Sequence, residues 1–332
     1  MSNRKWLFAV IPLFLLFGWL LVRFTLSFLH IHQLVRPLEA VEPIDGSPGK
    51  KIVLISQERG NYFWQAIEQG AHEAAAKYGL RLDYIGPDRI NPSEQIKLLD
   101  KAISAKADAI VVQGINDPEY RALIDKAAGL GIPVVTVDTD EPGSKRLAYV
   151  GTDNEGAGRQ MGELVAHAAG ERGEIGVLIS SEQVENQRLR LAGFRSVIGQ
   201  YPGLHIVEIR SSNISRLQAV QQARQMLIQS PNIRYMVGFS ALDGPGILEA
   251  AQRVGVSGLH IFAFDDMSET VTAIRQSKIE SAIVQQPVEM GAQAIERLHD
   301  FFSGSTPTSV TYTRTYVMDK GSTGQNDGGE TP

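Results

Sequence analysis

Short apolar runs alternate with amphipathic stretches from residue 51 to about residue 320, and this alternation predicts the fold class. The run at 52–55 has the length and β-branched content of a buried strand. A polar loop follows, and a helix is expected to begin at Asn61. Its apolar and small positions recur at helical spacing and form one stripe: Phe63, Ile67, Gly70, Ala71, Ala74 and Tyr78. This strand–loop–helix unit places its loop at the carboxyl end of the strand, where open α/β sheets bind ligands.

The same alternation continues to the end of the globular part. Further strands are predicted at 82–85, 109–112, 133–137, 148–150, 175–179, 205–209, 235–239, 261–264, 282–284 and 310–317. Helices are predicted at 92–105, 118–130, 155–169, 187–200, 216–229, 246–254, 269–276 and 288–302. Strand, helix and strand at this spacing predict parallel pairing through right-handed crossovers. Similar content on either side of about residue 150 predicts an α/β fold with two doubly wound parallel-sheet lobes.

The first 29 residues show a different pattern of apolar and charged positions. Arg4 and Lys5 precede an apolar run at 6–22, which Arg23 interrupts and which continues to residue 29. The full run is long enough to cross a membrane. A cleaved signal peptide is the alternative, but no small-x-small cleavage site occurs between residues 22 and 40. We therefore expect residues 1–29 to be a cytoplasmic tip and one N-terminal transmembrane helix, an uncleaved signal anchor with the rest of the chain outside the cytoplasm.

Composition narrows the remaining classes. Residues 30–50 are rich in Pro and polar residues, which predicts a linker, and the Gly-rich residues 321–332 predict a disordered tail. The globular part is ordinary, with 43% hydrophobic and 21% charged residues. A net charge of −5 argues against a nucleic-acid partner. The absence of Cys excludes thiol catalysis and Cys-ligated metals, and the seven His are scattered, so no metal site is expected.

No motif for catalysis or for a cofactor is found. The Gly-rich stretch at 151–158 opens a helix but lacks the G-x-G-x-x-G spacing and the G-K-[ST] ending, so it does not indicate nucleotide binding. There is also no G-x-S-x-G elbow. We expect no cofactor and no enzyme activity.

Two acidic residues stand at comparable places in the two predicted lobes. Asp138 and Asp265 each follow a strand directly. Either one alone could simply cap a turn. Two strand ends that both carry an aspartate favour a binding role. Arg188 and Arg190 begin a helix, where a cation opposes the helix dipole, so pairing with an acid or a polar ligand is an alternative to a surface position.

Four further residues stand near the predicted strand ends. Asn61 suits a helix N-cap. Phe63 lies on the apolar stripe and could belong to the core, whereas Trp64 lies off the stripe, where stacking on a ligand explains it better than packing does. Gln285 ends a strand and could be a hinge residue or a hydrogen-bonding residue.

From Lys51 to about Lys320 the chain resembles the periplasmic sugar-binding proteins of bacterial transport systems, closest to the ribose-binding type, which are relatives of the ligand-binding core of LacI-type repressors. The motifs that carry the resemblance are N-Y-F-W at 61–64, V-T-V-D at 135–138, G-T-D-N at 151–154, R-L-R-L-A-G-F at 188–194, F-D-D at 264–266 and I-V-Q-Q-P at 283–287. The resemblance implies two lobes, 51–152 with 286–312 and 153–285 with 313–320. A three-strand hinge would join them near 151–152, near 285–286 and around Thr313, and sugar would bind in the cleft as the lobes close.

The resemblance also implies the site. Hydroxyl groups of the sugar would bond to polar side chains and its ring would lie between aromatic ones: Asn61, Asp138, Arg188, Asp265 and Gln285, with Phe63, Trp64 and Phe264. Two positions depart from the ribose type, because Thr139 stands where that type has an arginine and Ser240 where it has an asparagine. Both changes shorten side chains in the pocket, so a larger or differently hydroxylated sugar than ribose is expected.

These features favour a membrane-anchored, extracytoplasmic (periplasmic or extracellular) solute-binding protein. It would either feed an ABC permease or present its ligand to a sensor histidine kinase, and an uncleaved membrane helix favours the sensory partner. A LacI-type transcription regulator would need a helix-turn-helix before the core, where residues 1–50 instead predict a membrane span and a linker. An enzyme on the same fold would need a nucleophile–base pair or a metal cluster, and neither is indicated.

Overall fold

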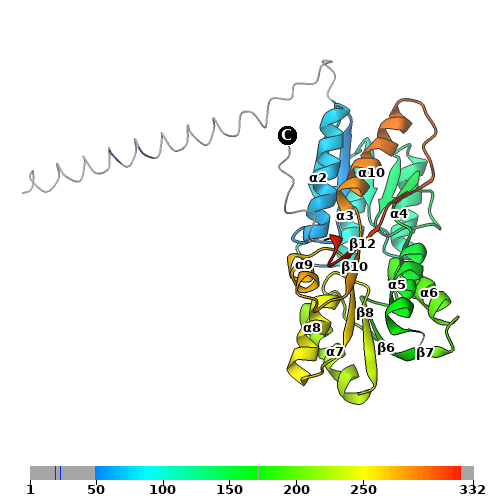
Figure 1. Cartoon of the computed structure of the whole chain (residues 1–332). Coiled ribbons are helices and arrows are strands. Elements are labelled where there is room, and N and C mark those ends of the chain that lie inside the picture. The colour runs from blue at the N-terminus through cyan, green and yellow to red at the C-terminus, as the bar shows by residue number, and fades with distance from the viewer. Residues whose placement is uncertain (1–18, 20–22, 24–48, 171, 323–332) are drawn as a thin grey trace, which may run out of the picture. The chain divides into compact units, whose positions relative to one another are not determined.

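The first strand and helix form the unit expected from the sequence. In the computed structural model, which describes residues 19, 23, 49–170 and 172–322, β1 (Lys51–Ile55) leads through a loop into α2 (Tyr62–Lys77) (Figure 1). Asn61 caps α2, because its side-chain oxygen accepts a hydrogen bond from the Phe63 N–H at 2.8 Å. The polar loop thus lies at the carboxyl end of β1.

In the described part of the chain, twelve strands form two six-stranded sheets whose strand orders are equivalent. The first sheet runs β11-β5-β4-β3-β1-β2 and the second β12-β10-β9-β8-β6-β7. The strands of the first sheet after β1 are β2 (Arg81–Ile85), β3 (Ala109–Val112), β4 (Val134–Val137), β5 (Ala148–Thr152) and β11 (Val310–Thr313). Those of the second are β6 (Arg172–Ile179), β7 (Gly203–Ser211), β8 (Ile233–Gly238), β9 (His260–Phe264), β10 (Ser281–Val284) and β12 (Tyr316–Asp319). All neighbouring strands are parallel except β10 and β12.

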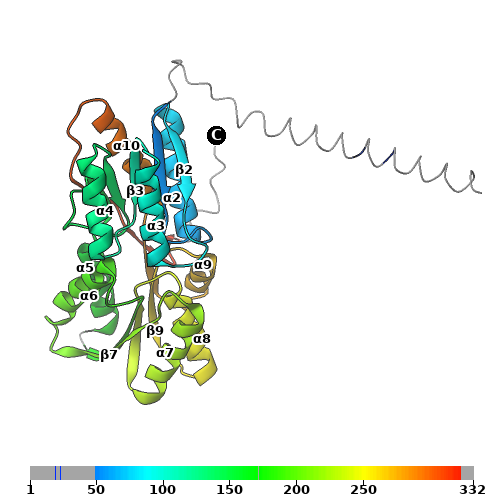
Figure 2. The same cartoon turned by 180° about the vertical axis from the view of Figure 1, so that it is seen from behind.

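Helices cover both faces of each sheet. The first lobe has α2 and α10 on the face seen in Figure 1 and α3 and α4 on the face seen in Figure 2. The second has α5 and α6 against one face and α7, α8 and α9 against the other. The helices after α2 are α3 (Pro92–Ser104), α4 (Pro118–Gly129), α5 (Asn154–Ala169), α6 (Glu185–Ile198), α7 (Arg216–Gln229), α8 (Asp243–Val254), α9 (Ser268–Arg275) and α10 (Pro287–Phe302). The predicted α/β fold with two parallel-sheet lobes is confirmed.

The last predicted strand is wrong in one respect. Residues 310–317 read as one strand, but the chain forms β11 in the first sheet and, after two residues, β12 in the second. The chain therefore crosses between the lobes three times: after β5, after β10 and after β11. All three crossings lie at the same end of their sheets, beside the strand ends that carry the acidic residues.

The apolar stripe of α2 is confirmed at Ile67, Gly70, Ala71 and Ala74, and it differs from the prediction at its two ends. Trp64 is 2% exposed and packs in the core with Ile67 and Ala71, whereas Phe63 is half-buried. Gly70 faces α10 rather than the sheet, because a Cβ there would lie 1.8 Å from the carbonyl oxygen of Val288. Glycine on this face lets the backbones of α2 and α10 touch.

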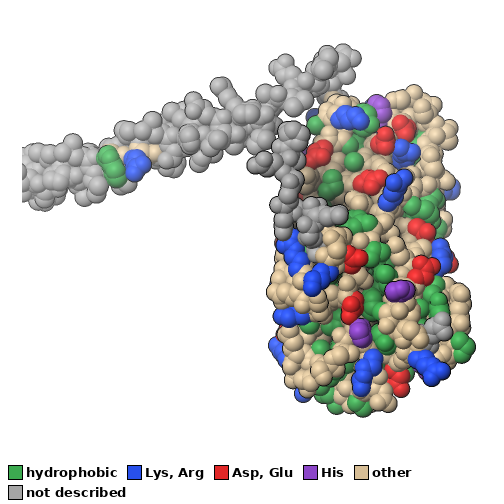
Figure 3. Space-filling model, viewed as in Figure 1, with side chains coloured by type: hydrophobic (Ala, Val, Ile, Leu, Met, Phe, Trp, Pro, Cys, Tyr) green, Lys and Arg blue, Asp and Glu red, His purple; other side chains and the backbone are tan. Residues whose placement is uncertain are grey.

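The predicted transmembrane helix falls outside the described residues, apart from Trp19 and Arg23, and so do most of the predicted linker and tail. Within the described part of the chain, no helix combines the length and the apolar character that crossing a bilayer needs. On the face of the globular part drawn in Figure 3, acidic and basic side chains are interspersed.

Candidate functional site

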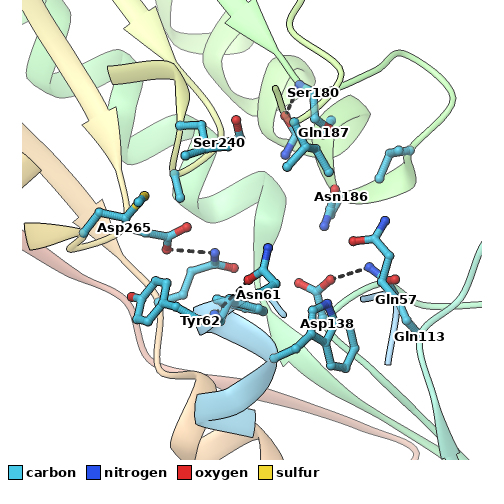
Figure 4. A pocket seen from close by; sticks show the side chains of 18 of the residues that line it. Gln57, Asn61, Tyr62, Gln113, Asp138, Ser180, Asn186, Gln187, Ser240 and Asp265 are labelled. Carbon is cyan, nitrogen blue, oxygen red and sulfur yellow. Dashed lines mark hydrogen bonds between the residues drawn. The ribbon is translucent and has the colours of Figure 1, made fainter. Parts of the chain in front are cut away.

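A cavity lies between the two lobes, at the carboxyl ends of both sheets (Figure 4). Its volume is about 180 Å³, and side chains from both lobes line it. Seven of the ten residues singled out in the sequence line this cavity: Asn61, Phe63, Trp64, Asp138, Ser240, Asp265 and Gln285. Thr139, Arg188 and Phe264 do not line it.

Asp138 and Asp265 occupy equivalent positions in the two lobes. Each follows the third strand of its sheet order, β4 or β9, and each backbone N–H donates to the neighbouring strand, at 3.0 Å to Val150 O and 2.8 Å to Ile283 O. Both residues have a left-handed backbone, with φ of 65° and 63°. This conformation is uncommon outside glycine, and Asp tolerates it better than most residues. The chain thus turns sharply at both strand ends while the two carboxylates line the same cavity.

The arginine that serves this cavity is Arg190. Its side chain is 3% exposed, and its guanidinium lies over the Phe264 ring at 4.1 Å. It donates three hydrogen bonds of 2.7–2.8 Å: from Nε to Asn154 Oδ1, from Nη1 to Phe239 O and from Nη2 to Gln285 Oε1. Burial lowers the pKa of Arg190, and the carboxylates Asp265 and Asp138 oppose that shift. A buried cation therefore interacts electrostatically with two buried acids.

Arg188, which the resemblance placed in the pocket, lies on the outer face of α6. Its side chain is 58% exposed and pairs with Glu185, three residues earlier. Residues two apart on a helix point to nearly opposite sides. Since Phe194 is buried, Arg190, four residues before it, faces inward and Arg188 faces solvent. The assignment of Arg188 is wrong for this geometric reason.

Gln285 connects Arg190 to Asp265. Its amide oxygen accepts from Arg190 and from Thr152 Oγ1 at 2.8 Å, and its Nε2 donates to Asp265 Oδ1 at 3.0 Å. Burial raises the pKa of Asp265 to about 6, while Arg190 and the Gln285 hydrogen bond act in the opposite direction. The charged form of this acid therefore depends on the donors around it.

Asp138 has its own set of donors. Gln113 Nε2 donates to Asp138 Oδ2 at 2.7 Å, and the Thr139 hydroxyl reaches the same oxygen at 3.2 Å. Asn186 Nδ2, from the second lobe, donates to Thr139 Oγ1 at 3.1 Å. Burial raises the pKa of Asp138 and Arg190 lowers it. Thr139, expected to face the ligand, instead lies behind the carboxylate and supports it.

The aromatic residues are arranged differently from the expectation. Phe63 lines the cavity and is half-buried. Trp64 also lines it, but its ring belongs to the core of the first lobe, so the sequence interpretation that set it apart from packing is wrong. Phe264 is fully buried in the second lobe, beside Phe239 and beneath Arg190, so it supports the guanidinium rather than forming a wall.

Several polar atoms around the cavity are buried without a partner among the described residues. These are Gln113 Oε1, Asn186 Oδ1 and Ser240 Oγ. Ser240 is held through its backbone N–H, which donates to Asp243 Oδ2 at 2.9 Å, and its hydroxyl is left unpaired. Buried polar groups without a hydrogen bond are costly, so a ligand with several hydroxyl groups would gain from pairing with them.

Among the described residues, two hydrogen bonds join the lobes beside the cavity in addition to the Thr152–Gln285 bond. One is the Asn186–Thr139 bond; in the other, Tyr62 OH, from the start of α2, donates to Asp266 Oδ1 at 2.5 Å. Burial and the hydrogen bond to Asp266 raise the pKa of Tyr62, so this hydroxyl remains a donor at neutral pH. The two bonds hold the lobes together on either side of the binding space.

Sequence reasoning missed Tyr62, Gln113, Asn186 and Gln187 as cavity residues and preferred the wrong arginine of its pair. Gln113 follows β3 directly, as Asp138 follows β4, so the same rule about strand ends would have found it. Asn186 and Gln187 lie in the first turn of α6, and no local pattern separates them from surface residues. Among the described residues no group of three or more metal-ligating side chains occurs.

Known proteins match this chain over most of its length. A sequence profile of the periplasmic binding protein domain matches residues 52–306. GanP, a glucose-galactose binding protein from Geobacillus stearothermophilus, is 35% identical and superposes with a TM-score of 0.80, over 83% of this chain and 99% of GanP. A chain of the XylFII–LytSN complex is 34% identical, with a TM-score of 0.77 over 82% and 99%. The ribose import binding protein RbsB of Bacillus subtilis is 23% identical over 74% of this chain and 79% of its own.

Proposed function

The chain belongs to the periplasmic binding protein family, as the resemblance predicted, and we propose that it binds a monosaccharide or a similar polyhydroxylated small molecule between its lobes. The observation that carries the proposal is the pair Asp138 and Asp265, which bring two buried carboxylates from opposite lobes to one small cavity. Carboxylates accept hydrogen bonds from hydroxyl groups, and closure that excludes water strengthens each bond. The names of GanP and RbsB, which bind sugars, support the same ligand class.

The polar atoms left unpaired around the cavity indicate which class of ligand is expected. Gln113 Oε1 and Asn186 Oδ1 are acceptors, and Arg190 already donates to three protein oxygens. The cavity thus offers more acceptors than donors, which favours a neutral sugar over a sugar phosphate or a sugar acid. Ser240, which lines the cavity where the ribose type has the longer asparagine, supports a sugar other than ribose.

A sugar panel tests this proposal. The purified full-length protein is heated with pentoses, hexoses including D-glucose, and inositols, and its unfolding is followed. A sugar at a hundredfold excess over its Kd should stabilise the folded state by about 2.7 kcal/mol. Asp265→Asn should abolish the shift, whereas Arg188→Met should keep it. No stabilisation by any sugar, or chemical conversion of one, would overturn the proposal.

We further propose that residues 1–29 anchor the protein in the membrane, with the lobes outside the cytoplasm. The apolar run and the basic residues before it support this anchor. An anchored protein should stay in the membrane fraction after an alkaline wash, and deletion of residues 1–29 should release it. Recovery of the full-length chain in the soluble fraction would refute the anchor.

The partner is either an ABC permease or a sensor histidine kinase. The name of RbsB, an import binding protein, supports the permease, and the XylFII–LytSN complex supports a partner of the LytSN kind. The two outputs separate in a deletion strain. Loss of sugar uptake would identify the permease, and loss of a transcriptional response with uptake unchanged would identify the sensor.

A further inference from the structure

Two side chains of the first interlobe crossing bond to polar residues of the cavity without lining it themselves. Thr152 is the last residue of β5 and is 2% exposed. Asn154 is the first residue of α5 and is 4% exposed. Asn154 Nδ2 donates to Thr152 O at 3.1 Å, which turns its Oδ1 toward Arg190 Nε at 2.8 Å. On its cavity side, the first interlobe crossing therefore supplies a hydrogen-bond acceptor to Arg190.

The Thr152 hydroxyl fixes the orientation of the Gln285 amide. An amide oxygen has two lone pairs, and in Gln285 they are taken by Thr152 Oγ1 at 2.8 Å and Arg190 Nη2 at 2.7 Å. A flipped amide would place its NH₂ group against the guanidinium, which has no acceptor. The observed orientation leaves Nε2 facing Asp265 Oδ1 at 3.0 Å. Thr152 thus acts on the carboxylate through one intermediate side chain.

We propose that Thr152 and Asn154 are positioning residues that hold Gln285 and Arg190 in the orientation in which Asp265 receives its donor. The arrangement exists without a ligand, and only its consequence for sugar affinity rests on the proposed function. Because Thr152 lies in the sheet of the first lobe and Asp265 in the second, the same bonds tie the carboxylate to the interlobe crossing.

The pKa of Asp265 depends on the groups around it, so its protonation reports whether the Gln285 donor is in place. Arg190 and the Gln285 hydrogen bond lower the pKa of Asp265, and burial and the charge of Asp266 raise it. The charged and titratable groups that face it come from several elements: Arg190 of α6, the adjacent Asp266, Tyr62 of α2 and Tyr316 of β12. Only the Gln285 donor depends on the Thr152 hydroxyl, so a change at Thr152 isolates that contribution.

The ligand-free experiment compares Thr152→Val, which removes the hydroxyl at nearly constant volume, with Thr152→Ser, which retains it. In each background the full-length chain is unfolded in urea over a range of pH, with and without Asp265→Asn. The difference between the two forms gives the midpoint at which Asp265 titrates. Thr152→Val should raise the proton affinity of Asp265 about three- to tenfold, the worth of one neutral hydrogen bond, and Thr152→Ser should leave it unchanged.

Asn154→Ala should shift the midpoint in the same direction, which keeps the proposal testable if Thr152→Val does not fold. A uniform loss of stability at every pH, with the midpoint unmoved in both variants, would overturn the proposal, because that is the signature of a structural role. Titration with D-glucose near neutral pH adds the ligand readout, with about three- to tenfold weaker binding expected in Thr152→Val and recovery in Thr152→Ser. If the wild-type protein does not bind D-glucose, the proposed function fails for this sugar. The titration midpoint of Asp265 still decides whether Thr152 and Asn154 are positioning residues.

Discussion

Replacing Arg190 should cost far more than replacing Arg188, although the two arginines are two residues apart on α6. Arg190→Met removes the cation that faces both buried carboxylates and keeps much of the side-chain volume. Arg188→Met removes an exposed cation that pairs only with Glu185 among the contacts described. The pair of variants therefore compares the same chemical change in a buried and in an exposed setting.

The magnitude follows from the contacts. Arg190 is 3% exposed and donates three hydrogen bonds to protein oxygens, and its charge lowers the pKa of Asp138 and Asp265. Removing one partner of a buried charge pair costs about 3–5 kcal/mol, because the other charge stays buried without compensation. An exposed ion pair such as that of Arg188 contributes about 0.2–1 kcal/mol. We expect the two variants to differ by at least about 2 kcal/mol in the free energy of unfolding.

The assay is urea unfolding near neutral pH, repeated at about pH 5. Without Arg190 the pKa of Asp265 should rise further, so protonation of the carboxyl at the lower pH should recover part of the lost stability of Arg190→Met. Arg188→Met should show no such recovery. Equal stabilities of the two variants, or an Arg190→Met deficit that does not change with pH, would refute the assignment of the buried arginine.

Three other predictions concern the pH dependence, the lobe contact and the helix packing. Folding raises the pKa of Asp265 from 3.8 to about 6, so the folded state holds a proton that the unfolded chain has released. Asp265→Asn should therefore gain stability relative to wild type as pH rises from about 4 to about 6, with a constant advantage above; a gap that does not vary with pH would contradict this. Tyr62→Phe should remove the hydrogen bond to Asp266 and weaken sugar binding about three- to tenfold, because the sugar dissociates faster. Stopped-flow measurement of the dissociation rate checks this, and an unchanged rate would argue against a contact that holds the lobes together. Gly70→Ala should lower the free energy of unfolding by about 1–3 kcal/mol, because the new methyl group meets the backbone of α10. Gly129→Ala, which has open space around it, should raise the free energy of unfolding by about 0.5–1 kcal/mol. Similar effects of the two substitutions would refute the packing argument.

Hydrophobic patterning predicted the elements of the globular part well because the continuous apolar runs of β1, β3, β4 and β9 are strands buried on both faces. β3 begins and ends where the pattern placed it, and α7 does as well. The division of residues 310–317 into β11 and β12 could not be predicted, since the run alternates without Gly or Pro and only the positions of two separate sheets decide where it breaks.

The site residues that follow a strand directly were predicted from the sequence. The site residues whose place depends on which face of a helix they occupy were missed. Asp138 and Asp265 follow strands, and parallel strands bring their carboxyl ends together. Phe63 and Trp64 stand four and three residues before Ile67, so both fit a stripe through it and spacing alone could not choose between them. For α6 the signal was present, because Arg190 lies at helical spacing from the buried Phe194 and Val197 and Arg188 does not.

The late return of the chain to the first lobe constrains the order in which the protein can fold. Residues 50–152 alone leave α2 without its neighbour α10 and leave the edge of β5 unpaired, because α10 and β11 follow the whole second lobe in sequence. The second lobe in turn lacks β12 until the last described residues are made. Multidomain chains commonly fold from the N-terminus during synthesis, but here neither lobe is finished until β11 and β12 have been made. Both lobes should therefore fold late and together, through contacts of high sequence separation. This makes folding slow and leaves strand edges exposed to aggregation until β12 has been made.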